Sequence, residues 1–447
     1  MTMVNPGQHR IWIFETGWQA AAAGLALAIM LVLTLGATEA MQAQTFQVIH
    51  DFTGGVDGAE PTFGLTIDAA GNLYGTTFEG DAGTGTAYKL VHKSTGWALT
   101  PLYVFTITSN GVIPYSTLVP GRDGKLYGTT GFGGIGPCLA YGHTGCGTVF
   151  SLQTPGTFCH TSYCPWIETP LYKFSGGADG STPYGATLVF DAAGNLYGTT
   201  FGGGSASCTN GCGLVYKLTP AGSGWTESTV YAFIGGADGA APWAGVTLDQ
   251  AGNLYGTTSA GGAFGGGTVY ELSPSGSGWT KRILHSFQLS QTDGASPFAG
   301  LIFDPSGNLH GATQYGGSGG GGTVFELSPS GGNWTFTTLY SFSGSGGGRA
   351  KGPVADLVMD SAGNLYGSTA GDGVYRFGSA FKLTHGTGGW TYTSLHDFTN
   401  GLDGGSLRSN LVFDSAGNLY GTASTGGTGN PVSCVGSCGV VWQITPH

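Results

Sequence analysis

The chain has 447 residues, of which 87 are glycine, and a formal net charge of −11 at pH 7. Charged residues make up 9% of it and aromatic residues 12%, the reverse of the balance in disordered chains, so we expect a folded protein that buries aromatic rings. The glycines follow no three-residue period, which excludes collagen. The net negative charge is spread along the chain, and no run of basic residues interrupts it. This charge distribution argues against nucleic acid and anionic membrane surfaces as partners.

The N-terminal segment has the pattern of an export signal. Arg10 precedes an apolar run from Ala20 to Ala37, and small or polar residues follow from Ala40 to Gln44. This order predicts a secretory signal peptide over residues 1–43, with cleavage near Ala40 or Ala43. An uncleaved signal anchor is the alternative, and it would be the one membrane attachment, because we expect no second apolar segment and no C-terminal anchor. Residues 44–447 would then be secreted, in the extracellular space or the periplasm.

One segment, Gly-Asn-Leu-Tyr-Gly-Thr-Thr, recurs along the rest of the chain. With its degenerate copies it occurs seven times, at intervals of 53 to 70 residues. Its central position is occupied by Tyr74, Tyr127, Tyr197, Tyr255, His310, Tyr366 and Tyr420. A period of this size indicates stacked supersecondary units rather than unrelated domains.

The third copy shows what one unit contains. Short β-forming runs lie at 188–191, 196–200, 213–218 and 225–233, separated by clusters of Gly, Pro, Asn and Asp. No helical period is present, so each unit is expected to form four short strands. Four strands per unit, repeated seven times, predict an all-β fold, a seven-bladed β-propeller of four-stranded blades.

The two ends of the repeat region predict how the ring closes. The last copy has three strands and lacks the outermost one, whose pattern elsewhere is Leu-Tyr-x-Phe. Residues 46–52, Phe-Gln-Val-Ile-His-Asp-Phe, match residues 394–398, Ser-Leu-His-Asp-Phe. We expect this N-terminal segment to pair into the last blade, which would remove the open sheet edges that favour aggregation.

These motifs carry a family resemblance. The Gly-Asn-Leu-Tyr-Gly-Thr-Thr core, the Gly-Thr-Val-Phe strand at 147–150 and the Asp-Gly-x-x-Pro turn resemble the GloVer (Gloeobacter/Verrucomicrobia-type) tandem-repeat family. The resemblance covers about residues 46 to 445 and implies a secreted, propeller-like bacterial protein. It implies no biochemical activity and no catalytic residue.

The eight cysteines fall into four close pairs. An even count with local pairing behind a signal peptide predicts short disulfides, and three of the pairs would brace the Gly-rich loops after Thr-Thr. Zinc is the alternative, but no pair has His partners in a repeated arrangement, so we expect no metal there. The expected disulfides are Cys138–Cys146, Cys159–Cys164, Cys208–Cys212 and Cys434–Cys438.

Two loop sets are the candidates for ligand binding. By analogy with other propellers, the strand ending in Leu-x-Phe-Asp is innermost, and the Asp-Gly-x-x-Pro connections then share one face with the Gly-rich loops. The candidate ligand-binding rings on these loops are Tyr115, Tyr184, Trp243, Phe298, Phe201 and Tyr315. Packing between blades is the alternative for each ring. The recurring Trp97, Trp225, Trp279, Trp334 and Trp390 are interpreted as blade packing.

The repeated Asp-Gly motif has two interpretations. A ring of carboxylates could bind calcium, or each Asp could cap its own turn while the Gly supplies a positive φ. Because the motif recurs in most blades, we favour the turn. Its aspartates are Asp57, Asp179, Asp238, Asp293 and Asp403.

Departures from the repeat concentrate in blades six, seven and one, which are neighbours in a closed ring. They form a predicted mixed-charge patch that includes the candidate ligand-binding residues Arg349 and Arg408. Its acidic members are Asp356, Asp372, Glu60, Glu79 and Asp81. Repeat decay on a solvated rim is the alternative interpretation.

The pattern favours an exported, monomeric propeller that binds an extracellular glycan. We expect no cofactor, although calcium is compatible with the Asp-Gly motif. One alternative is a glycoside hydrolase or lyase, in which Asp356 works with Asp372 or Glu79 as the catalytic carboxylate pair. Another is a scaffold that contacts a surface protein. The sequence has no nucleophile elbow, no zinc-protease motif and no phosphate loop.

Overall fold

The computed structural model describes residues 44–80, 83–107, 110–156, 164–185, 187–288, 292–343, 352–429, 434 and 437–445. The expected signal segment, residues 1–43, lies outside these residues. The fold described below is that of the unit from Thr45 to Thr445.

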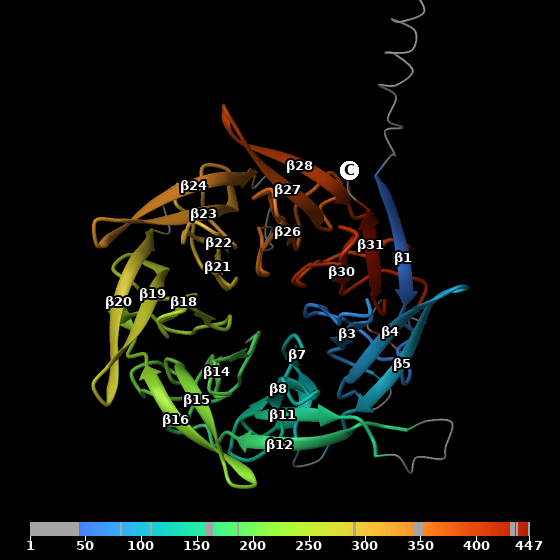
Figure 1. The fold of residues 1–447 in the computed structure, drawn as a ribbon, viewed down its shortest axis with the longest axis horizontal. Helices are drawn as coiled ribbons and strands as arrows, with labels where there is room; N and C mark the ends of the chain where they lie inside the picture. The colour runs from blue at the N-terminus through green and yellow to red at the C-terminus, as the bar shows by residue number, and fades with distance from the viewer. Residues whose placement is uncertain are drawn as a thin grey trace, which may run out of the picture. The chain divides into compact units, whose positions relative to one another are not determined.

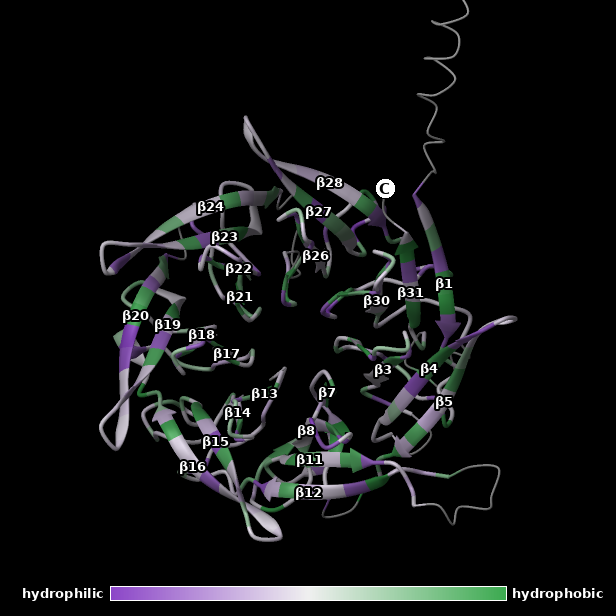
Figure 2. Ribbon diagram, viewed as in Figure 1, coloured by the Kyte–Doolittle hydropathy of each residue, from purple (hydrophilic) through white to green (hydrophobic). Residues whose placement is uncertain are grey.

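The described residues of this unit form a closed ring of seven antiparallel sheets, the blades (Figure 1). In the first six blades the strand order follows the chain from the axis outward, whereas the outermost strand of the seventh comes from the N-terminal end of the described chain. In each blade a two-residue innermost strand is followed by longer ones. Hydrophobic and hydrophilic residues alternate along the outer strands (Figure 2), as expected for strands with two differently packed faces. The prediction of a seven-bladed β-propeller is confirmed.

The first four blades follow one plan. Blade 1 contains β2 (Thr66–Ile67), β3 (Leu73–Thr76), β4 (Thr86–Lys93) and β5 (Gly96–Val104). Blade 2 contains β7 (Val119–Pro120), β8 (Leu126–Phe132), β11 (Thr148–Gln153) and β12 (Ile167–Lys173), and β6 (Val112–Pro114) also pairs with β8. Blade 3 contains β13 (Val189–Phe190), β14 (Leu196–Thr200), β15 (Leu214–Ala221) and β16 (Gly224–Ala232). Blade 4 contains β17 (Thr247–Leu248), β18 (Leu254–Thr258), β19 (Gly265–Ser275) and β20 (Gly278–Gln288).

The remaining blades complete the ring. Blade 5 contains β21 (Ile302–Phe303), β22 (Leu309–Thr313), β23 (Gly320–Ser330) and β24 (Asn333–Ser343). Blade 6 contains β25 (Val358–Met359), β26 (Leu365–Thr369), β27 (Ser379–Gly386) and β28 (Gly389–Asp397). Blade 7 contains β29 (Val412–Phe413), β30 (Leu419–Ala423), β31 (Val440–Thr445) and β1 (Thr45–Asp51).

Short elements lie in two connections. β9 (Leu139–Ala140) and β10 (His143–Thr144) form a small hairpin in the blade 2 loop, and a 3₁₀ turn, η1, spans Gly236–Asp238. Among the described residues, no helix is long and apolar enough to cross a membrane.

Strand β1 closes the ring as predicted. It pairs antiparallel with β31, with Thr45 opposite Thr445 and Asp51 opposite Val440. The first described strand therefore supplies the outermost strand of the last blade. This pairing gives β31 a partner on both sides, so its edge is not left open.

The Asn and Tyr of the repeated segment hold the turn between the two inner strands. In blade 1, Oδ1 of Asp68 accepts a bond from the Asn72 backbone N–H at 2.9 Å, and Oδ2 accepts bonds from Asn72 Nδ2 at 2.8 Å and the Tyr74 hydroxyl at 3.0 Å. The same carboxylate–Asn–Tyr arrangement recurs at Asp191, Asp249, Asp360 and Asp414. These Asp, Asn and Tyr side chains therefore have a structural role in the turn.

The Gly of the segment is required by a crossing ring. A Cβ on Gly75 would lie 2.4 Å from the Tyr88 hydroxyl oxygen on the next strand. The equivalent contacts join Gly128 to Phe150, Gly198 to Tyr216, Gly256 to Tyr270, Gly311 to Phe325, Gly367 to Phe381 and Gly421 to Trp442. A large aromatic thus fills the centre of each blade, and the glycine lets the strands approach over it.

Neighbouring blades are joined by hydroxyls and by the recurring tryptophans. Thr199 Oγ1 donates to the Ala244 carbonyl of the next blade at 2.8 Å. The Trp279 ring lies 6.2 Å from the Tyr197 ring of the preceding blade, and Trp97, Trp225, Trp334 and Trp390 make equivalent contacts. The interpretation of these tryptophans as blade packing is confirmed.

The Asp-Gly motif builds turns, as favoured from the sequence. Asp179 accepts bonds from the Ser175 backbone N–H at 2.8 Å and from the hydroxyl of Tyr172, on the outermost strand, at 3.1 Å. The other four aspartates likewise bond to a Tyr or His of that strand. The carboxylates are thus engaged at the perimeter, away from the axis.

Candidate functional site

The two predicted loop sets share one face of the propeller. The connection from the outermost strand to the next blade and the Gly-rich loop of that next blade pair through backbone bridges, as between Ala59 and Glu79, Ser181 and Gly202, and Ala240 and Ala260. Since the innermost strands lie at the axis (Figure 1), the strand order first taken by analogy is confirmed. We call this side the loop face.

A cavity of about 400 Å³ lies at the axis on the loop face, and every blade contributes to its wall. We call it the axial cavity. Its volume falls in the range of roughly 300–1,000 Å³ that is typical of small-molecule sites. It is lined by Thr62, Phe63, Gly64, Tyr115, Thr117, Tyr141, Gly185, Trp243, Phe298, Gln314, Tyr315, Val354, Asp356, Arg408 and Asn410.

Six of the fifteen residues that line this wall are aromatic, and four of them form a chain of ring contacts with Tyr184. Phe63 contacts Tyr115 with ring centroids 4.9 Å apart, Tyr115 contacts Tyr184 at 4.4 Å, and Tyr184 contacts Trp243 at 5.3 Å. Trp243 contacts Phe298 at 5.1 Å. These five rings, the aromatic arc, come from five consecutive blades and hold one another in place.

The opposite part of the wall is polar. Asp356, Arg408 and Asn410, which we call the polar sector, come from blades 6 and 7. Asp356 accepts a bond from the Gly300 backbone N–H at 2.5 Å and one from Asn410 Nδ2 at 3.0 Å. Burial raises the pKa of Asp356, and these two donors oppose that rise.

Small residues on the neighbouring blades leave room for the polar sector. A Cβ on Gly300 would lie 2.9 Å from Asp356 Oδ1, and a Cβ on Gly64 would lie 2.7 Å from the Cβ of Asn410. Each glycine lies two residues before the innermost strand of its blade. A larger residue at Gly64 or Gly300 would therefore displace the polar sector.

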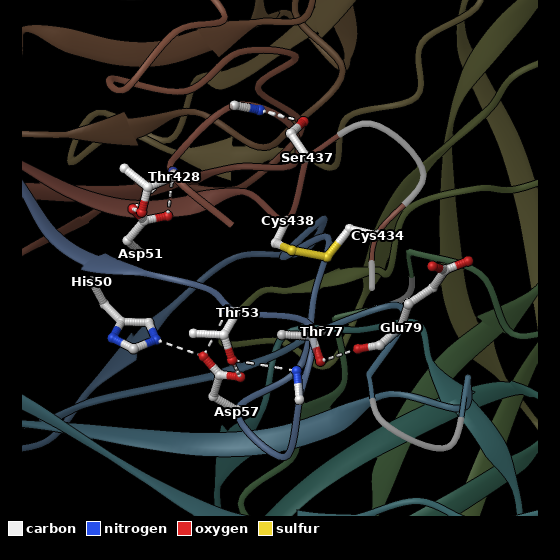
Figure 3. Close-up of a disulfide and its surroundings, with 12 residues drawn as sticks. His50, Asp51, Thr53, Asp57, Thr77, Glu79, Thr428, Cys434, Ser437 and Cys438 are labelled. Carbon is white, nitrogen blue, oxygen red and sulfur yellow. Dashed lines mark hydrogen bonds and ion pairs between the residues drawn. A yellow bond between two sulfur atoms is a disulfide. The ribbon is translucent and has the colours of Figure 1, made fainter. Parts of the chain in front are cut away.

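A second polar cluster joins blades 7 and 1 beside the cavity. Burial and the nearby charge of Glu79 raise the pKa of Glu60 to about 7, against the opposing effect of Arg408. Glu60 has a positive φ of 56°, and its backbone N–H donates to the Cys438 carbonyl at 2.8 Å. Figure 3 shows the Glu79 carboxylate directed away from the Asp57 turn. An acid that titrates near neutrality thus stands beside a guanidinium and a second carboxylate.

A groove continues from the aromatic arc across blades 2 and 3. We call it the loop groove; its volume is about 790 Å³ and its lining includes Phe132, Leu139, Tyr184, Phe201 and Asn210. Tyr184 also contacts Tyr115 and Trp243 of the axial cavity, so one ring connects the two hollows.

Disulfides brace the loops around both hollows. Cys138–Cys146 and Cys208–Cys212 lie in the loops that form the groove, and Cys434–Cys438 lies beside the Glu60 cluster (Figure 3). These three predicted pairs are confirmed. Cys164 is also disulfide-bonded, whereas Cys159 lies outside the described residues.

The structure brings most of the sequence-predicted site residues together. The axial cavity contains Tyr115, Trp243, Phe298, Tyr315, Arg408 and Asp356, and the loop groove contains Tyr184 and Phe201. Glu79 belongs to the Glu60 cluster. Asp372 is not among the cavity-lining residues; its charge acts on Tyr340 and Tyr392, in the outermost strands β24 and β28. Arg349 and Asp81 lie outside the described residues.

Sequence reasoning did not single out five of the polar and aromatic lining residues as site residues: Asn410, Thr62, Thr117, Gln314 and Tyr141. Asn410 carried a signal, since it is a large polar residue at a position where three other blades have Gly. Tyr141 lies in a long loop outside the repeat, where alignment of the blades gives no position.

Fold and site define this chain as a seven-bladed β-propeller with an aromatic-lined axial cavity. Its sequence matches the Gloeobacter/Verrucomicrobia repeat over residues 37–207, 138–352 and 280–447, so the chain belongs to that family. No curated protein matches its sequence.

The solved structures to which this chain is similar have low sequence identity to it. The extracellular domain of a hybrid two component system from B. thetaiotaomicron has a TM-score of 0.50 at 12% identity over 90% of this chain. This chain covers 41% of that structure. A protein of unknown function from Dyadobacter fermentans has a TM-score of 0.45 at 11% identity, over 90% of this chain and 99% of that one. The NanB sialidase from Streptococcus pneumoniae has a TM-score of 0.42 at 12% identity, over 89% and 70%.

Proposed function

We propose that this propeller is exported and binds an extracellular glycan on its loop face. The observation that carries the proposal is the division of one cavity wall into an aromatic arc and a polar sector. The disulfides support the exported location, because such bonds persist in oxidising compartments.

A sugar ring needs both halves of such a wall. Its C–H face is apolar and packs on aromatic rings, whereas its hydroxyls need charged or amide partners when they leave water. Trp243 and Tyr115 would supply the packing surface. Arg408 and Asn410 would supply hydrogen bonds to the hydroxyls. Neither residue belongs to the repeated Asp-Gly or Gly-Asn turn motifs.

The loop groove supports an extended ligand rather than a single sugar. Tyr184 lies between the two hollows, so a chain seated in the axial cavity would run over this ring onto Phe201. The two disulfide-braced loops that form the groove lower the entropic cost of holding such a chain, since they are already constrained.

One observation favours a second candidate, a glycoside hydrolase. Glu60, with its pKa raised to about 7 and a second carboxylate near it, has the property required of a general acid at neutral pH. In this candidate Glu60 replaces Asp372 in the acid–base pair expected from the sequence, because Glu60 lies near the cavity-lining Arg408, whereas Asp372 lies near the outermost strands.

A glycan array with the secreted mature chain, run with and without calcium, tests the proposal. We expect retention of a subset of polysaccharides, without a calcium requirement, because the repeated aspartates are engaged in turns. Retention on no glycan would refute the proposal. Release of reducing ends from a retained glycan, abolished by Glu60→Gln, would establish the hydrolase instead.

A further inference from the structure

A cluster of potential metal ligands lies in blade 5, apart from the axial cavity. Atoms of Asp304, His310 and Glu326 all lie within 4.8 Å of one another. His310 Nε2 lies 3.4 Å from Asp304 Oδ2 and 3.8 Å from Glu326 Oε2. The His310 side chain is only 2% exposed, and the carboxylates are 15% and 22% exposed.

Comparison with the other blades shows that two substitutions coincide here. His310 stands where the repeat has Tyr, and Glu326 is its partner on the next strand. In blades 1, 3 and 6 that partner is a lysine, and Lys89, Lys217 and Lys382 each lie over the Tyr ring at 5.2 to 5.7 Å. Blade 5 thus has a second carboxylate where those blades have a cation.

Blade 4 shows what the usual Tyr does between two carboxylates. There the Tyr255 hydroxyl lies 3.2 Å from Asp249 Oδ2 and 3.0 Å from Glu271 Oε1, so it fills the space between them. The shorter His310 leaves longer gaps to the equivalent atoms. These gaps are close to the separation of about 3.4 Å between ligands of a tetrahedral metal ion with bonds near 2.1 Å.

Hydrogen bonds hold both carboxylates of this cluster in place, and the one to Asp304 is the Asn–Asp bond that recurs in the turns of other blades. Asn308 Nδ2 donates to Asp304 Oδ2 at 2.7 Å, and Ser328 Oγ donates to Glu326 Oε1 at 2.6 Å. Such outer contacts orient ligating carboxylates. Nδ1 of the buried His310 has no partner among the described residues and would carry the ring proton when Nε2 coordinates.

We propose that Asp304, His310 and Glu326 bind one divalent transition-metal ion of the Zn²⁺ type, with solvent as the fourth ligand. One imidazole and two carboxylates suit Zn²⁺. The ion would supply the positive charge that lysine supplies in blades 1, 3 and 6, and it would link the β21–β22 turn to β23. Three protein ligands are too few for Ca²⁺, which takes six to eight oxygens.

Cobalt titration of the tag-free, EDTA-treated mature chain tests this site, because tetrahedral Co²⁺ gives a visible absorption band. We expect one equivalent to bind and Zn²⁺, but not Ca²⁺, to displace it. Absence of the band, or displacement by Ca²⁺, would overturn the proposal.

The repeat provides matched variants. His310→Tyr restores the residue of the other blades and Glu326→Lys the residue of blades 1, 3 and 6, so both should fold in EDTA and bind no Co²⁺. Tyr255→His should create a second equivalent in blade 4, where Asp249 and Glu271 already stand. Full Co²⁺ binding by both loss variants, or a folded Tyr255→His chain with no second equivalent, would contradict the proposed ligands.

Discussion

Asp356 and Asn410, on neighbouring blades, are joined by two hydrogen bonds of 3.0 Å. The Asp356 backbone N–H donates to Oδ1 of Asn410, and Nδ2 of Asn410 donates to Oδ2 of Asp356. The same carboxylate accepts the Gly300 N–H of blade 5, so one side chain connects three consecutive blades. The Asp356 carboxylate, which lines the axial cavity, therefore also joins the blades to one another.

Asn410→Ala should lower the free energy of unfolding by about 1–3 kcal/mol near neutral pH, because it removes one of two donors to the buried Asp356 carboxylate and leaves the Asp356 backbone N–H without its acceptor. The loss should shrink toward acid pH. Burial already raises the pKa of Asp356 above its ordinary 3.8. The ionised form therefore opposes folding as pH rises, and removal of a donor strengthens this effect. Urea unfolding at both ends of the range measures it. Thr117→Ala, at the equivalent position of blade 2, is the control and should show no such pH dependence.

Glu60→Gln should stabilise the protein at neutral pH and above. The pKa of Glu60 is raised from 4.5 to about 7, so wild-type stability falls as pH rises between these values. Gln carries no charge to desolvate, and we expect a gain of about 1–2 kcal/mol above pH 7, less than the full shift implies because solvent screens a partly exposed group. Below pH 4.5 wild type and variant should coincide. Parallel stability–pH curves across the whole range would show that Glu60 titrates normally.

Trp243→Ala should weaken glycan binding tenfold or more, which corresponds to about 1.4 kcal/mol. The ring contacts both Tyr184 and Phe298, so its loss also releases the middle of the aromatic arc. Phe264→Ala is a matched control, since Phe264 lies in the same blade, is 55% exposed and does not line the axial cavity. Isothermal titration with a glycan retained on the array measures both. Equal losses in the two variants would remove the axial cavity from consideration as the site.

The fold was predictable because each blade repeats the same local chemistry. Asp68, Asn72 and Tyr74 fix one turn, and the same residue types recur at the same spacing in most copies. The closure by β1 followed from a missing strand at one end and a matching segment at the other. Both features can be recognised from the amino-acid sequence alone.

The site was predictable only in part. The aromatic arc follows from rings that occupy one repeat position, whereas the partnership of Asp356 with Asn410 depends on two inner strands 54 residues apart meeting at the axis. Asp372 illustrates the opposite outcome. It shares a blade with Asp356, but its loop places it against the outer strands. Residue spacing within an irregular loop gives no distance from the axis.

Hydroxyls between blades give a final prediction. Thr199→Val should cost about 1–3 kcal/mol, because it keeps the side-chain shape but leaves the Ala244 carbonyl without its buried donor. The exposed Thr219→Val is the control and should stay within about 0.5 kcal/mol of wild type.

The reverse change is available in blade 5, where Ala312 occupies the position of Thr199. Ala312→Ser should add about 0.5–1.5 kcal/mol by donating to the Ala355 carbonyl, as Ser368 donates to Ser409 across the next junction at 3.0 Å. Urea unfolding of both variants measures the two effects. If Thr199→Val costs no more than Thr219→Val, the blades are held together by ring packing and not by these hydroxyls.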